Sequence, residues 1–238
     1  MKLRQTLIIC LLSAMALFVS ASMLLAQEQS SRPEEIEWTW EVRPQHADPG
    51  LPNVLLVGDS ITRNYYSEVK RLLEKVANVY LFAASTSLGD PRLNRQLTEF
   101  ASMEGKQFVV VHFNNGMHGW NYSEAEYKAA FPSYMATLHS IAPKAAFIWA
   151  TTTPVKKEDS PGPTNARIKA RNEIVQSSIA SLRVPIDDQY ELMTHHADLY
   201  QDNVHFSEAG AAIQGQQVAA LIKKQLAIVE TSEPSRQK

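Results

Sequence analysis

Short apolar runs alternate with longer amphipathic stretches along most of this chain. Each apolar run is rich in Val, Ile and Phe and is too short to form a buried helix, so it predicts a strand. These runs cover residues 53–57, 79–82, 108–113 and 146–151, with a weaker run at 182–186. Because helical patterns separate them, the sequence predicts one α/β domain with a five-stranded parallel sheet and helices on both faces.

The stretches between these runs carry helical signals. Asp90-Pro91 is suited to start a helix, since Asp caps helices well and Pro is favoured at the first position. Ser123 and Glu126 form a capping box for a helix toward Ile141, which Pro132 is expected to kink. Apolar residues also recur at helical spacing over residues 61–76, 93–100, 168–182 and 207–229. In such folds the ligand site lies at the carboxyl ends of the strands.

The N-terminal residues have the pattern of an export signal. Lys2 and Arg4 precede an uncharged apolar run over residues 7–26, which holds the only cysteine, Cys10. A basic start, an apolar run and a small residue before polar sequence are typical of a cleaved secretory signal, here residues 1–26. The run also reaches the roughly 20 residues of a membrane span, so an uncleaved anchor is the alternative. We therefore expect a secreted or periplasmic protein without disulfides.

The rest of the chain divides into a leader, a domain and a tail. Residues 27–48 form a leader whose first part is polar and expected to be flexible, although Trp38 and Trp40 alternate as in an extended segment. Residues 49–230 form the α/β domain, and residues 231–238 a flexible tail. The formal net charge of −2 and the absence of a basic run give no electrostatic reason to expect a nucleic-acid partner.

Two short motifs suggest nucleophilic catalysis. Gly58-Asp59-Ser60 directly follows the first expected strand of the domain, and Asp202 precedes His205 by three residues near the C-terminus. A serine hydroxyl needs an adjacent base, and that base needs a third group to orient it. An Asp three residues before a His can bind the imidazole Nδ1 in a tight turn and leave Nε2 for the serine. The alternative for Ser60 is a simple helix N-cap, and for Asp59 a turn residue rather than a second catalytic acid.

The order of these motifs resembles the SGNH, or GDSL, hydrolase family. Residues 57–62 look like the first block of that family and residues 202–206 like its last, with a glycine and an asparagine after the intervening strands. The resemblance implies a three-layer, flavodoxin-like fold and ester hydrolysis or acyl transfer. It implies Ser60 as nucleophile, His205 as general base and Asp202 as its orienting partner. The implied oxyanion hole consists of the backbone N–H groups of Ser60 and Gly89 and the Asn114 amide.

Two blocks depart from the family pattern. The third block usually reads Gly-x-Asn-Asp, whereas this chain has His112 at the glycine position and the pair Asn114-Asn115. A shift of one residue would give the oxyanion role to Asn115 instead. The second block lacks the usual asparagine before Gly89. The assignment of this glycine therefore depends on its place before a capped helix.

For other polar and aromatic residues, the sequence gives weaker indications of a functional role. His118 and Trp120 lie on a loop that should border the site, and we consider them candidate substrate contacts beside a purely structural role. Tyr122 could form a sugar-stacking wall or pack the loop. The spacing of His112 and His118 is not typical of a metal site. Arg167, Arg171 and Asn172 are expected to form a solvated helix face.

The sequence therefore predicts an exported serine esterase that needs no metal or organic cofactor. The polar and aromatic residues expected at the rim, Asn115, His118, Trp120 and Tyr122, suit a hydroxylated ligand. We expect short-acyl esters, most of all acetyl groups on carbohydrate. The alternatives are an acyltransferase to sugar hydroxyls with the same triad, a lipase or thioesterase, and a binding module without catalysis.

Overall fold

Six strands form a single sheet in the order β1-β3-β2-β4-β5-β6 in the computed structural model, which describes residues 30–232. The strands are β1 (Thr39–Val42), β2 (Asn53–Gly58), β3 (Asn78–Ala84), β4 (Phe108–Phe113), β5 (Ala146–Ala150) and β6 (Ile186–Asp187). Strands β2 to β6 are parallel, as expected, whereas β1 pairs antiparallel with the edge of β3. The α/β fold is confirmed. The expected strand count was one too low, because part of the leader adds an edge strand.

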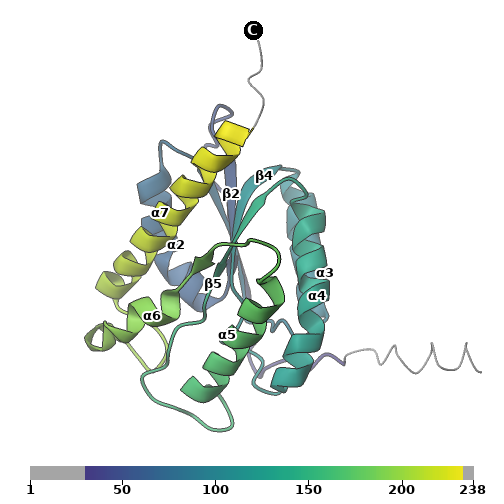
Figure 1. The fold of residues 1–238 in the computed structure, drawn as a ribbon, viewed down its shortest axis with the longest axis vertical. Coiled ribbons are helices and arrows are strands. Elements are labelled where there is room, and N and C mark those ends of the chain that lie inside the picture. Colours follow the sequence, from purple (N-terminus) through teal and green to yellow (C-terminus); the bar gives the residue numbers. More distant parts are fainter. Residues whose placement is uncertain (1–29, 233–238) are drawn as a thin grey trace, which may run out of the picture. The chain divides into compact units, whose positions relative to one another are not determined.

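Helices cover both faces of this sheet (Figure 1). They are α2 (Ser60–Leu73), α3 (Arg92–Glu104), α4 (Glu124–Ile141), α5 (Asn165–Ile179), α6 (Gln189–Thr194) and α7 (Glu208–Ser232). Helices α2 and α7 pack together on one face, and α3, α4 and α5 lie side by side on the other. After β2 the chain first adds β3 on one side of β2 and then returns to add β4 on the other side. In folds of this kind, a crevice forms at the carboxyl ends of the two strands where the direction changes, here β2 and β4.

The alternation of side chains along each strand builds two cores. In β2, Leu55 and Val57 join the core beneath α3, α4 and α5, while Val54 and Leu56 join the core beneath α2 and α7. Leu55 and Leu56 are both completely buried, because helices cover both faces. Burying a side chain of this size contributes about 1.5–3 kcal/mol. The near-continuous apolar sequence of the strand follows from this burial on both sides.

The expected capping box at the start of α4 is confirmed, whereas α3 begins one residue later than expected, with Pro91 and not Asp90 at its N-cap position. Ser123 and Glu126 make the capping box at the start of α4, and Pro132 lies inside that helix. The Asp90 carboxylate accepts a hydrogen bond from the N–H of Arg92, the first residue of α3. The short helix α6 was not expected from the sequence, because it lacks a full amphipathic repeat.

Residues 31–42, which we call the strap, lie against the loops at the carboxyl ends of the strands. The Ser31 hydroxyl donates to Asp90, and the Arg32 N–H donates to the Tyr122 hydroxyl oxygen. The sequence indicated flexibility for the first part of this segment. These contacts tie it instead to loops that are about 60 to 90 residues away in the chain.

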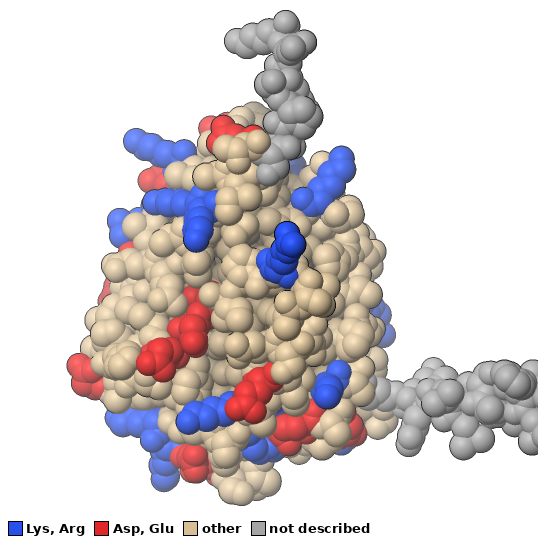
Figure 2. Space-filling model, viewed as in Figure 1, with Lys and Arg blue, Asp and Glu red and all other residues tan. Residues whose placement is uncertain are grey.

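Acidic and basic side chains are mixed on the face shown in Figure 2, which agrees with the small net charge. Within residues 30–232, none of the helices combines the length and apolar character that a membrane crossing requires. The expected signal or anchor, residues 1–26, lies outside the described residues. Most of the expected tail, residues 233–238, does so as well.

Candidate active site

Ser60, His205 and Asp202 form a continuous hydrogen-bonded chain. The Ser60 Oγ lies 2.7 Å from the His205 Nε2, and the His205 Nδ1 lies 2.8 Å from the Asp202 Oδ2. The structure thus brings together three residues that are up to 145 positions apart. Because a carboxylate only accepts, the imidazole carries its hydrogen on Nδ1 and offers the lone pair of Nε2 to the serine.

The end of β2 and the start of α2 position Ser60. Asp59, not Ser60, is the N-cap of α2, and its Oδ1 accepts the N–H of Ile61 at 2.9 Å. The Ser60 side chain is therefore released from a capping role. A Cβ on Gly58 would lie 2.0 Å from the Thr62 Oγ1, so only glycine allows the strand to turn this closely into the helix. The Ser60 N–H belongs to the first helical turn, whose amides have no acceptor within the helix.

A small hairpin presents His205 to the serine. Tyr200 and Phe206 pair across its base as an isolated bridge, and their rings stack at a centroid distance of 4.3 Å. Asn64, one turn beyond Ser60 on α2, donates its side-chain amide to the Phe206 carbonyl at 2.8 Å. This bond connects the helix of the serine directly to the loop of the histidine, and so fixes their separation.

Asp202 is held as a carboxylate. Burial raises its pKa, but the N–H groups of His205 and Val204 and the His205 imidazole together bring the pKa below its ordinary value. The side chain remains about half exposed, so water screens this effect. A lowered pKa keeps Asp202 ionised at neutral pH, which is the state that an orienting partner needs.

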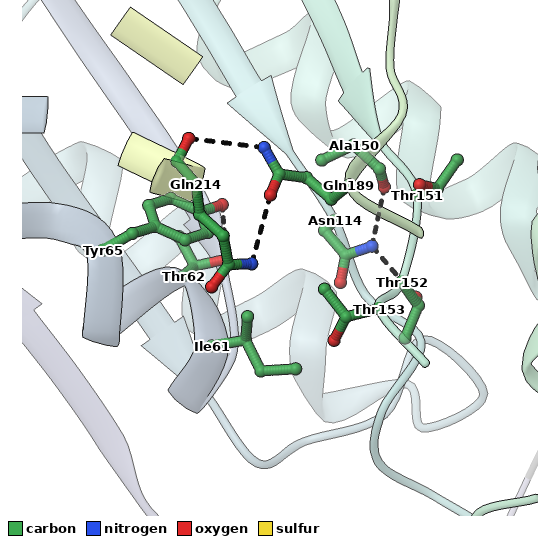
Figure 3. Close-up of a pocket in the computed structure, with 10 residues that line it drawn as sticks. All are labelled: Ile61, Thr62, Tyr65, Asn114, Ala150, Thr151, Thr152, Thr153, Gln189 and Gln214. Atoms are coloured by element: carbon green, nitrogen blue, oxygen red, sulfur yellow. Dashed lines mark hydrogen bonds between the residues drawn. The ribbon is translucent and has the colours of Figure 1, made fainter. Parts of the chain in front are cut away.

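Asn114 and Asn115 follow β4 but face different neighbours. The Asn114 amide nitrogen donates to the Ala150 carbonyl at 2.7 Å and to the Thr152 Oγ1 at 3.0 Å (Figure 3). The Asn115 oxygen accepts the Leu88 N–H, while its nitrogen donates to the Thr86 carbonyl. The Asn115 side chain thus stabilises the loop after β3 through hydrogen bonds to its backbone. Asn114 lines a pocket next to the residues that follow Ser60.

This pocket is small and has both polar and apolar lining groups. Its volume is about 10 Å³, and α2, α7 and the ends of the central strands enclose it. Figure 3 shows its lining: Ile61, Thr62, Tyr65, Asn114, Ala150, Thr151, Thr152, Thr153, Gln189 and Gln214. A space of this size holds about one water molecule. Oxygens of Thr153 and Gln214 have no hydrogen-bond partner within the described residues and could bind such a water.

Gly89 lies in the buried loop before α3. A Cβ at this position would come within 2.6 Å of the Tyr122 ring. Packing against this ring therefore requires a glycine here, whether or not the residue takes part in catalysis. Its N–H donates to the Ser87 Oγ at 3.2 Å. The Gly89 N–H can bind an oxyanion only if its hydrogen bond to Ser87 breaks. The oxyanion role of Gly89 therefore stays a prediction.

The loop after β4 differs from the expected rim. Tyr122 and Asn115 are almost completely buried, with 1 % and 5 % of their surface exposed. They therefore pack the loop and cannot form a wall against a sugar, which corrects two of the four expected rim residues. His118 and Trp120 are partly exposed, and both contact protein groups. His118 binds Glu34 at 2.9 Å, and the Trp120 ring is covered by the Arg171 guanidinium at 4.1 Å.

The expectation of a solvated face on α5 was wrong. Arg171 is completely buried, and its guanidinium donates to the carbonyls of Gly116, His118, Gly119 and Tyr122. Arg167 binds Glu124 and the carbonyls of Trp120 and Tyr122. The Asn172 amide pairs with both backbone groups of Thr152. These side chains fix the loops that border the site instead of facing water.

A buried hydrogen-bonded network beneath the site was also missed. The His112 Nε2 lies 2.7 Å from the Asp187 Oδ2, and neither side chain is exposed. Gln189 and Gln217 donate hydrogen bonds to the carboxyl oxygens of the same Asp187 side chain. The only signal for this network in the sequence was a charged residue, Asp187, directly after the weak apolar run 182–186.

Comparisons with known proteins found a matching family model and several solved structures with a similar fold. Residues 56–213 match the model of the GDSL-like Lipase/Acylhydrolase family. A lipase/acylhydrolase from Enterococcus faecalis is similar in structure, with 24 % identity, a TM-score of 0.58, and coverage of 74 % of this chain and 97 % of that one.

Two further solved structures share the fold. The catalytic domain of peptidoglycan O-acetyltransferase A from Streptococcus pneumoniae has 16 % identity, a TM-score of 0.56, and coverage of 74 % of this chain and 96 % of that one. The acetyl xylan esterase AlAXEase has 13 % identity, a TM-score of 0.55, and coverage of 71 % and 99 %. No curated protein matches the chain.

Proposed function

Because this chain belongs to the GDSL-like lipase/acylhydrolase family and is a carboxylic ester hydrolase, we propose that it removes short acyl groups from a hydroxylated substrate through an acyl-enzyme on Ser60. The observation that carries the proposal is the unbroken chain of Ser60, His205 and Asp202, with both linking distances below 3 Å. This arrangement is the one that a weak serine nucleophile requires.

The reaction proceeds in two transfers. The His205 Nε2 removes the Ser60 proton while Oγ attacks the ester carbonyl, and Asp202 stabilises the imidazolium that forms. The imidazolium then protonates the leaving alcohol, so an acyl-serine and a free alcohol result. In the second half, His205 activates a water molecule that attacks the acyl-serine. The acid is released, and the proton returns to Ser60.

The oxyanion is stabilised by N–H donors at the ends of β2 and β4. The Ser60 N–H comes from the first turn of α2, where the helix dipole also favours negative charge. Asn114 reaches the oxyanion if its 3.0 Å bond to Thr152 is exchanged for a bond to the charged oxygen. A neutral bond of this kind contributes about 0.5–1.5 kcal/mol, and a bond to a charged group about twice as much, so the exchange is favourable in the transition state.

The small pocket next to the nucleophile is compatible with a preference for short acyl groups. The pocket next to Ile61 and Asn114 has a volume of only about 10 Å³ and carries polar oxygens. It holds about one water molecule and therefore offers no channel for a long acyl chain. We propose acetyl as the acyl group and carbohydrate as the alcohol, because His118 and Trp120 remain partly exposed at the rim. The acetyl xylan esterase and the peptidoglycan O-acetyltransferase with this fold act on such groups, as their names state.

The site of action is proposed to lie outside the cytoplasm. The basic and apolar pattern of residues 1–26 supports export with cleavage, and a retained anchor over residues 7–26 is the alternative. Mass spectrometry of the protein from the culture fluid and from membranes distinguishes them. A mature chain starting near residue 27 is expected.

A chain-length series of aryl esters, followed by acetylated glycans, tests the substrate class. We expect the highest kcat/KM for acetyl and propionyl esters, and release of acetate from acetylated glycan. A kcat/KM that rises steadily beyond about eight acyl carbons, by ~0.8 kcal/mol per methylene, would show burial of an apolar chain and identify a lipase or thioesterase. Acyl transfer to an added sugar without free acid would identify an acyltransferase.

A further inference from the structure

We propose that Trp38 and Trp40 of the strap, together with Arg63 of α2, form a subsite beside Ser60 for a sugar unit that carries a carboxylate. This inference rests on the proposed function, because it names the class of carbohydrate from which the triad removes an acyl group. Trp38 and Trp40 lie outside residues 56–213, which the family model matches, so the family resemblance does not supply these two residues.

Arg63 lies close to the nucleophile. It follows Ser60 by three residues on α2, and residues at this spacing are neighbours on the helix surface, with Cβ atoms about 5–6 Å apart. Its backbone N–H donates to the Asp59 carbonyl at 3.0 Å, which places Arg63 in the first turn of the helix. Arg63 is exposed. A carbohydrate whose ester is held at Ser60 can therefore contact the guanidinium through a neighbouring group.

Two indole rings hold the Arg63 guanidinium. Its central carbon lies 5.1 Å from the ring centroid of Trp38 and 5.1 Å from that of Trp40. Within residues 30–232 the Arg63 side chain has no acidic partner, whereas Arg92 of α3 forms ion pairs with two carboxylates. A guanidinium held by aromatic rings keeps its five N–H donors, which can bind both oxygens of a carboxylate at once. Arg63 is therefore suited to an anionic ligand.

Trp40 provides an exposed aromatic surface beside this cation. It lies on β1, where it pairs with Ala83 of β3, and it is 51 % exposed. An indole is a flat apolar ring system with a polar N–H at its edge. The C–H groups on one face of a sugar ring can pack against such a ring and bury apolar area, while the hydroxyls stay free to form hydrogen bonds. Trp40 therefore suits a sugar unit next to the cation.

Trp38 connects this surface to the loops around the active site. Its backbone N–H donates to the Ser85 Oγ at 2.9 Å, and its carbonyl accepts the Ser85 N–H at 3.1 Å, directly after β3. Its ring meets the His118 imidazole edge-on, with the ring centroids 6.0 Å apart. His118 belongs to the loop that begins at Asn114. The subsite therefore adjoins the loop that carries the proposed oxyanion donor.

The same contacts have a purely structural alternative, in which Arg63 only fastens the strap to α2. In that case, removal of the guanidinium would affect charged and neutral substrates equally. A subsite for a carboxylate predicts a selective loss, because the charge-assisted hydrogen bonds form only with the charged substrate. The dependence on substrate charge therefore separates the two roles.

The test compares acetylated oligogalacturonate, which carries carboxylates, with an acetylated neutral oligogalactan of the same length. Arg63→Gln removes the charge, Arg63→Lys keeps the charge without the planar fork, and Trp40→Ala removes the exposed ring. Arg183→Gln is the matched control, because it removes an equal charge from an exposed position before β6, at the amino ends of the strands. Acetate release gives kcat/KM, and calorimetry with unacetylated oligogalacturonate gives Kd without any reaction. Thermal unfolding checks that each variant is folded.

We expect the wild type to have a kcat/KM for the acidic oligosaccharide about tenfold above that for the neutral one, as the gain of one charge-assisted contact predicts. This ratio should fall to near one in Arg63→Gln, recover in part in Arg63→Lys and stay unchanged in Arg183→Gln. The Kd of unacetylated oligogalacturonate should rise about tenfold in Arg63→Gln. Trp40→Ala should raise KM for both oligosaccharides by about threefold or more, because both lose the aromatic contact.

Equal kcat/KM values for the two oligosaccharides in the wild type, or an unchanged ratio in Arg63→Gln, overturn the proposal. Binding of oligogalacturonate that depends on Arg63, without release of acetate from either oligosaccharide or from an aryl acetate, defeats the proposed function and leaves the subsite supported. Release of acetate from an aryl acetate, without binding of oligogalacturonate, defeats the subsite and leaves the esterase function supported.

Discussion

Replacing Arg171 with methionine tests whether a buried cation holds the loop after β4. Methionine has a similar length and no donors, so the carbonyls of Gly116, His118, Gly119 and Tyr122 would lose their bonds at 2.7–3.3 Å. Burial lowers the pKa of Arg171 to about 10, which still leaves it charged at neutral pH. Hydrogen bonds from a charged donor contribute about 1.5–3 kcal/mol each.

These contributions do not simply add, because the cost of burying the guanidinium also disappears. Removing one partner of a buried charged network costs about 3–5 kcal/mol. For a domain of this size, that loss corresponds to a decrease in Tm of roughly 6–20 °C. We also expect kcat/KM to fall at least about tenfold, because the same loop begins at Asn114.

Urea and thermal unfolding followed by circular dichroism measure this loss. The matched control is Arg95→Met on α3, where the arginine side chain is 68 % exposed and makes only a 3.9 Å ion pair with Glu99. The control should change stability by less than about 0.5 kcal/mol. A loss below about 1 kcal/mol in Arg171→Met would refute the assigned role of this cation.

Four further substitutions separate the roles of neighbouring groups. Asn114→Ala should lower kcat about 10²–10³-fold with little change in KM, whereas Asn115→Ala should mainly lower Tm; the reverse pattern would move the oxyanion role by one residue. Asp202→Asn should lower stability at neutral pH. Because the pKa of Asp202 is lowered from 3.8, that difference should vanish as the pH falls through the folded value, as unfolding curves between pH 2 and 7 would show. Gly89→Ala should cost about 1–3 kcal/mol in urea unfolding through contact with the Tyr122 ring, and an unchanged midpoint would contradict this packing.

The sequence predicted the elements that depend on the local pattern of apolar and polar residues. The apolar runs identified β2, β4 and β5 nearly to the residue, since fully buried strands need continuous apolar sequence. The approach of Ser60 to His205 was also predicted, because the two motifs and their order resemble those of a family in which they act together.

Residues whose environment comes from distant segments were not predictable in the same way. Arg171 lies on the same face of α5 as Ile168 and Val175, but a charged side chain is expected to be exposed, and only the surrounding loop carbonyls make its burial favourable. Tyr122 is buried because Gly89 leaves room for its ring, 33 positions earlier in the chain. Glu34 looked like part of a polar leader, although its carboxylate binds a histidine 84 residues away.

Covalent labelling of Ser60 tests the central claim most directly. A fluorophosphonate probe reacts only with a serine whose proton is removed by a neighbouring base, and peptide mass spectrometry locates the adduct. We expect a single adduct on Ser60, its absence in Ser60→Ala, and labelling at least about 10⁴-fold slower in His205→Ala. An adduct on another residue, or an unchanged rate of labelling without His205, would contradict the account.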